Sequence, residues 1–146
     1  MSLESPAIDY ENYLDRLNYA RQNVEIHDNV VSNLVRLAEK SNLYNRCIIT
    51  LPYKIEKSGE LLAGDIDCLL IHNNGKNKIF FEVKNNKNKI NKAQTQYDKY
   101  LKTFSEDCIK VPGYVVCNGK SVYNLGNLEK VADSIEGFFS KIDVFA

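Results

Sequence analysis

The segments GDIDCLLI (Gly64–Ile71) and IFFEVK (Ile79–Lys84) contain the pattern that decides the fold. Charged and apolar residues alternate in both, which is typical of β-strands with one polar face and one buried face. Between them lies HNNGKNK, with an Asn-Gly pair at its centre (Asn74, Gly75). This pair predicts a β-hairpin closed by a type I′ turn, because both residues tolerate a positive φ.

A turn at this place sets Asp67 opposite Glu82 and Asp65 opposite Lys84 on one face of the ribbon. The second pair is favourable, whereas the first is not, because like charges directly opposed destabilise a sheet. A solvent-facing strand with cross-strand ion pairs is the simpler interpretation, but it gives no reason for the Asp67–Glu82 pair. A divalent cation between the carboxylates does, and such an ion can promote phosphodiester hydrolysis. Mg²⁺ needs only one or two protein carboxylates.

The rest of the chain predicts helices around the hairpin and one further strand–helix unit. The expected elements are helices at 5–21 and 24–42 (or one bent helix), a strand at 47–54, a turn at 57–60, a helix at 92–104, strands at 113–117 and 121–123, and a last helix at 127–140. This order predicts an α/β fold in which a central mixed β-sheet is flanked by helices.

Length and composition suit one domain spanning residues 1–146. Apolar residues make up 44% of the chain and charged residues 26%, as in ordinary globular proteins. No apolar run approaches the roughly 18 residues of a membrane helix, and the N-terminus lacks a signal-peptide pattern, so we expect a cytoplasmic protein without a membrane partner. The cysteines (Cys47, Cys68, Cys108, Cys117) lack C-x-x-C spacing and are expected to be buried and reduced.

The formal net charge is zero, but the positive charge is unevenly distributed. Between Lys76 and Lys102 only Glu82 and Asp98 oppose a run of lysines, namely Lys76, Lys78, Lys84, Lys87, Lys89, Lys92, Lys99 and Lys102. Local positive charge of this kind suits a phosphate backbone. A solvated lysine-rich face is the alternative.

The spacing of the charged residues resembles that of the PD-(D/E)XK nuclease superfamily, which is restriction-endonuclease-like. Asp67 is followed, after fourteen residues, by Glu82-Val83-Lys84. The surrounding sequence is similar to that of archaeal Holliday-junction-resolvase-like and RecB-like members, over roughly residues 24–117. The resemblance implies an αβββαβ core. It also implies that Asp67, Glu82 and the Val83 carbonyl bind Mg²⁺, for which Mn²⁺ can substitute, and that Lys84 is the catalytic lysine.

A second motif supports the resemblance. Gln96 and Tyr100 form a Q-x-x-x-Y pattern on the helix expected after E-x-K, which resembles an additional motif of RecB-like nucleases. Residues four apart share a helix face, so Gln96 is implied to hydrogen-bond a phosphate at the site. Tyr100 either packs near the site or belongs to the core.

Many members of the family also carry an acidic residue on the first core helix. Asp28 is preferred for this place because it lies near the apolar helix face, and Glu25 is the alternative. The two histidines, His27 and His72, receive no catalytic role, because a lone histidine is usually structural.

These observations predict a metal-dependent deoxyribonuclease acting on DNA, with an endonuclease favoured over a RecB-like exonuclease. A catalytically inactive nucleic-acid-binding module with the same fold is one alternative, and a structural protein whose hairpin is merely charged is another. Junction resolvases cut two strands symmetrically and work as two-fold dimers, so a homodimer is a further possibility.

Overall fold

The strands among residues 10–141 form one six-stranded sheet, in the order β1-β2-β3-β4-β5-β6. The structure, a computed structural model, describes residues 10–141, and the side chains among them from Val24 onward. Its elements are α1 (Tyr10–Ser41), β1 (Tyr44–Lys57), β2 (Glu60–His72), β3 (Lys78–Lys84), a 3-10 turn (Lys87–Lys89), α2 (Ile90–Phe104), β4 (Gly113–Cys117), β5 (Ser121–Asn124), β6 (Lys130–Ala132) and α3 (Ile135–Lys141).

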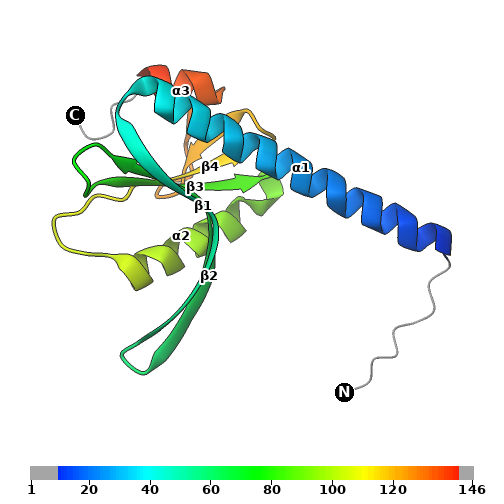
Figure 1. The fold of residues 1–146 in the computed structure, drawn as a ribbon, viewed down its shortest axis with the longest axis horizontal. Helices are drawn as coiled ribbons and strands as arrows, with labels where there is room; N and C mark the ends of the chain where they lie inside the picture. The colour runs from blue at the N-terminus through cyan, green and yellow to red at the C-terminus, as the bar shows by residue number, and fades with distance from the viewer. Residues whose placement is uncertain (1–9, 142–146) are drawn as a thin grey trace.

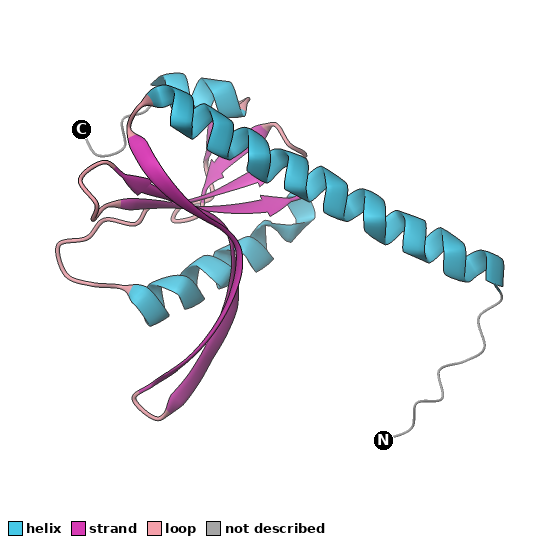
Figure 2. Ribbon diagram, in the orientation of Figure 1, coloured by secondary structure: helices cyan, strands magenta, loops and turns pink. Residues whose placement is uncertain are grey.

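Helices cover both faces of this sheet (Figures 1 and 2). Helices α1 and α3 pack on one face and α2 on the other, and all neighbouring strands are antiparallel except β3 and β4. The parallel pair requires a crossover connection, which α2 provides. The predicted α/β fold with a mixed, helix-flanked sheet is therefore confirmed.

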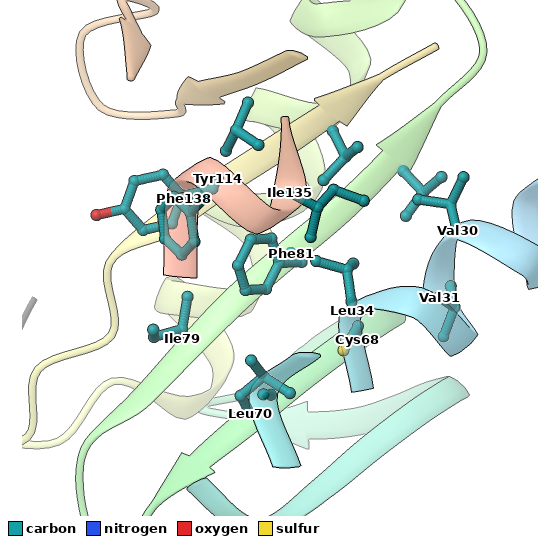
Figure 3. Close-up of a cluster of buried hydrophobic side chains, with 14 of the residues drawn as sticks. Val30, Val31, Leu34, Cys68, Leu70, Ile79, Phe81, Tyr114, Ile135 and Phe138 are labelled. Carbon is teal, nitrogen blue, oxygen red and sulfur yellow. The ribbon is translucent and has the colours of Figure 1, made fainter. Parts of the chain in front are cut away.

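Side chains of strand β3 are buried in the hydrophobic core on both faces of the sheet. Phe81 points toward α1 and α3, where it contacts Phe138 edge-on at 5.4 Å between ring centres and lies beside Leu34 (Figure 3). Phe80 points to the opposite face and packs against Tyr100 of α2. Both phenylalanines are completely buried, which explains why the apolar run in this strand is almost continuous.

The hairpin between β2 and β3 keeps its predicted register but not its predicted turn. The Gly75 N–H donates to the His72 carbonyl at 2.8 Å, and a positive φ occurs at Gly75 but not at Asn74. A type I′ turn needs a positive φ at both residues, so that prediction is wrong. Instead, Asn74 Oδ1 accepts the N–H groups of Lys76 and Asn77. The longer loop has the same centre, so the strand pairing is unchanged.

For the N-terminal region, the structure agrees with the alternative of a single helix. The regions 10–21 and 24–41 belong to one continuous helix, α1, while Ser5 and Pro6 lie outside the described residues. One helix prediction needs correction. The last helix begins at Ile135 rather than Asn127. Before it, Asn124 Oδ1 accepts the N–H groups of Gly126 and Asn127, which favours a turn over a helix. The chain then forms β6, and Leu128 is exposed instead of facing inward.

The cysteines are all free. Cys68 and Cys117 are buried, as predicted. Cys47 and Cys108 are exposed, because Cys47 lies on the edge strand β1 and Cys108 lies in the connection from α2 to β4. Among the described residues, no helix is both long enough and apolar enough to cross a membrane.

Candidate active site

Asp67 lies at a fork where β2 separates from β3. The β2–β3 ladder pairs Ile71 with Lys78 and ends at Cys68 and Phe81, whereas β2 stays paired with β1 as far as Glu60. Past the end of the ladder, the Val83 N–H donates to Asp67 Oδ2 at 2.8 Å. The carboxylate thus takes the place of a β2 carbonyl and closes the apex of the fork.

The β1–β2 hairpin bends at the level where the fork opens. On β1 the pairing passes from Ile49–Cys68 to Leu51–Ile66, and Thr50 between them has a φ of 45°. A β-branched residue rarely adopts this left-handed conformation, and strained residues of this kind cluster at functional sites. Figure 1 shows the outer part of this hairpin projecting away from the sheet.

Glu82 is buried beside Asp67. Only 2% of it is exposed, and Oε1 has no hydrogen-bond partner among the described residues. The two carboxyl groups lie close enough to share a hydrogen bond when Glu82 is protonated. Burial, and next the charge of Asp67, raise the pKa of Glu82 to about 9. The unfavourable carboxylate pair expected from the sequence is therefore present.

The two carboxyl groups titrate in opposite directions. Burial alone would raise the pKa of Asp67, but hydrogen bonds from His27 and from the Val83 N–H lower it below its usual value. Asp67 is therefore ionised at neutral pH, while Glu82 retains its proton in the absence of a cation. A divalent cation would displace that proton and would provide a ligand interaction for Glu82 Oε1.

Lys84 lies at the end of β3, with Nζ 3.7 Å from Glu82 Oε2 and only 22% of its side chain exposed. It was expected to pair with Asp65, but that pairing is wrong. Strand β2 has already left β3 at Asp65, which instead stands opposite Pro52 of β1 and is exposed. The ammonium group of Lys84 therefore belongs to the carboxylate pair itself.

A metal ion fits the donors at the fork. The N–H of Val83 points toward β2, and the N–H and C=O of one residue point to the same side of a strand, so its carbonyl faces the fork as well. Phe80 and Lys84 bond to the β4 side, which agrees with this alternation. Asp67, Glu82 and the Val83 carbonyl are the oxygen donors that Mg²⁺ prefers, with water completing its shell.

Side chains alone do not complete a metal site here. Among residues 24–141, no group of three or more His, Cys, Asp and Glu side chains is arranged to hold an ion by itself. This arrangement is compatible with Mg²⁺, which keeps several waters and uses few protein carboxylates.

Helix α1 reaches the site through His27. The His27 ring lies with Nε2 3.1 Å from Asp67 Oδ1 and Nδ1 3.5 Å from Asp28 Oδ1. The hydrogen bond with Asp67 is the largest cause of the raised pKa of His27, and burial opposes it. Asp28, the predicted first-helix acid, is 59% exposed and lies next to His27 Nδ1, the ring nitrogen that does not face Asp67. Glu25 is exposed too.

The sequence held a signal for His27. It stands four residues before Val31 and seven before Leu34, both of which are buried on the sheet-facing side of α1. A polar residue within such an apolar stripe points toward the sheet. His27 was given no role at the site only because a lone histidine is usually structural.

The Q-x-x-x-Y residues divide between two environments. Tyr100 is 4% exposed and packs on Phe80 and Phe104 at 5.1 Å between ring centres, so it belongs to the core. Gln96 is partly buried, and its Oε1 has no hydrogen-bond partner among the described residues. It reaches β2 at Gly64, three residues from Asp67, where a Cβ would lie 3.1 Å from Oε1.

Replacing Gly64 with alanine should destabilise the protein by about 1–3 kcal/mol, the usual cost of overpacking. The added Cβ would lie 2.5 Å from Tyr53 Oη as well as close to Gln96, so both side chains must move. Urea denaturation measures the change. Combining Gly64→Ala with Tyr53→Phe should cost less than the two changes separately, because the phenol is the nearest atom. Wild-type stability for Gly64→Ala would contradict the close packing.

Comparisons with known proteins give no relative for this chain: no protein-family model matches it, and no curated protein or solved structure matches it significantly.

Proposed function

We propose that this protein is a metal-dependent nuclease that hydrolyses DNA phosphodiester bonds, with a site of the PD-(D/E)XK kind. One observation carries the proposal. Glu82 is buried against Asp67 at a fork in the sheet, which raises its pKa to about 9, and Lys84 lies 3.7 Å away. This arrangement is costly without a cation and is suited to one.

A bound Mg²⁺ would supply an activated water and charge neutralisation on the phosphoryl oxygens. The residues of the chain do the rest. Asp67 is oriented by His27 and by the Val83 N–H, and Glu82 would lose its proton to solvent on binding the ion. Lys84 brings a positive charge to the place where negative charge grows on the phosphate in the transition state.

An endonuclease is the form that we favour, and the test distinguishes it from an exonuclease. Purified protein is incubated with labelled single-stranded, linear duplex, circular and four-way-junction DNA, with Mg²⁺, Mn²⁺ or EDTA. We expect metal-dependent cleavage that includes circular DNA, whereas an exonuclease would degrade only substrates with ends. The Lys84→Met variant, purified in parallel, excludes a contaminating nuclease.

A DNA-binding module without activity is the second candidate, favoured by the lysine-rich segment after β3. Salt-dependent DNA binding with no cleavage of any substrate in either metal would establish it and would contradict the nuclease proposal.

A further inference from the structure

An open pocket of about 290 Å³ adjoins the carboxylates at the end of β3. Its walls come from α1 on one side and from the end of β3 and the following segment on the other. The lining residues are Val24, His27, Val83, Lys84, Asn85 and Lys89. Four of these six residues have basic or amide side chains, the other two are valines, and none is acidic, so the pocket suits an anion.

The three lysines between the end of β3 and the start of α2, Lys84, Lys87 and Lys89, have different surroundings. Lys84 lies beside Glu82, and Lys87 lies over the ring of Tyr123 at 5.6 Å, on the side of β5. Lys89 is exposed at the pocket and has no ion-pair partner among the described residues. Its ammonium group is therefore the one that the fold leaves available to a ligand.

The size of the pocket and its position indicate which anion it takes. At about 290 Å³ it is at the lower end of the range for ligand pockets, which suits one nucleotide unit of a strand and not a duplex. Lys84 belongs both to this pocket and to the carboxylate pair, so a phosphate in the pocket would be a near neighbour of the phosphate at the site.

We propose that Lys89 binds the phosphodiester next to the one that is cut, so that a DNA strand passes from the carboxylates into the pocket between α1 and the segment that follows β3. Lys89 is then a positioning residue that sets the register of the strand. This inference rests on the proposed function, because it uses the same site.

The test measures binding without cleavage. A fluorescent single-stranded oligodeoxynucleotide is titrated with wild-type protein, Lys89→Gln and Lys92→Gln in EDTA at several salt concentrations. Lys92 is an exposed lysine three residues further on that does not line the pocket. Its variant is the matched control, because Lys92→Gln and Lys89→Gln have the same net charge. Lys89→Gln should weaken binding about fivefold to tenfold and reduce the salt slope by about 0.7, the value for one phosphate contact with a single strand. Lys92→Gln should change affinity less than about twofold.

Oligonucleotides with one methylphosphonate linkage locate the contact. At one position the neutral linkage should weaken wild-type binding but not binding by Lys89→Gln, because the partner of that phosphate is already missing. Equal losses for the two lysine variants, no such position, or no wild-type binding would overturn the proposal. Binding that depends on Lys89 in a protein that never cuts DNA would support the pocket and contradict the nuclease function. DNA cleavage by a protein whose Lys89→Gln and Lys92→Gln variants bind DNA equally well would support the nuclease function and contradict the role of Lys89.

Discussion

Replacing Glu82 with glutamine should abolish cleavage and, at the same time, make the metal-free protein more stable. In the folded state the pKa of Glu82 is raised from an ordinary 4.5 to about 9. Between these values the folded protein binds more protons than the unfolded chain, so the free energy of unfolding falls as the pH rises. Glutamine has no such dependence, because it stays neutral at every pH.

The gain from Glu82→Gln should be small near about pH 5 and reach the order of 2–4 kcal/mol near about pH 8. Mg²⁺ should stabilise the wild type, because it binds the folded state, but should have little effect on the variant. Urea denaturation at both pH values, in EDTA and in Mg²⁺, measures all four conditions. Glu129→Gln, which changes an exposed carboxylate in the turn before β6, is the matched control. A variant less stable than the wild type at the higher pH in EDTA would refute the buried, opposed carboxylates.

Replacing Lys84 with methionine should lower the rate of cleavage by about 10²–10³-fold, the usual loss when a charge that stabilises a transition state is removed. The variant keeps Asp67, Glu82 and the Val83 carbonyl, so it should still be stabilised by Mg²⁺. Its Glu82 holds its proton more tightly, because the ammonium group of Lys84 lowers that pKa. Mg²⁺ should therefore bind best at higher pH.

Single-turnover cleavage and Mg²⁺-dependent stability, measured on the same preparation, separate these effects. Lys102→Met is the control, because Lys102 is paired with Glu60 at the distal end of the hairpin, with Nζ 3.0 Å from Oε1. Wild-type cleavage by Lys84→Met would remove this residue from the mechanism. Loss of Mg²⁺ stabilisation together with cleavage would make its role structural.

The local parts of the site were predictable from sequence, and the tertiary parts were not. The register that places Asp67 beside Glu82 followed from the hairpin centre, and it survived an incorrect turn type because the observed loop has the same centre. The contact between His27 and Asp67 joins elements forty residues apart, and a helical periodicity cannot specify its partner.

The bend of the β1–β2 hairpin was also beyond sequence reasoning. Thr50 has high β-propensity, so its residue type does not predict the left-handed conformation that it adopts beside the fork. The assumption that both strands continue straight produced the incorrect Asp65–Lys84 pair. The predicted start of the last helix was wrong for a local reason. The Asn124 side chain accepts hydrogen bonds from the Gly126 and Asn127 N–H groups and so favours a turn, although the residues that follow have helical apolar spacing.

The bond from the Val83 N–H to Asp67 has an evolutionary consequence. Asp67 closes the end of a strand ladder, so selection for folding alone would preserve it in a descendant that had lost all activity. Glu82 offers no such benefit, since its burial costs stability unless a cation is bound. In a lineage of such proteins, an aspartate retained at position 67 would therefore indicate only that the fold is preserved. A glutamate retained at position 82 would indicate that the metal-dependent chemistry is preserved.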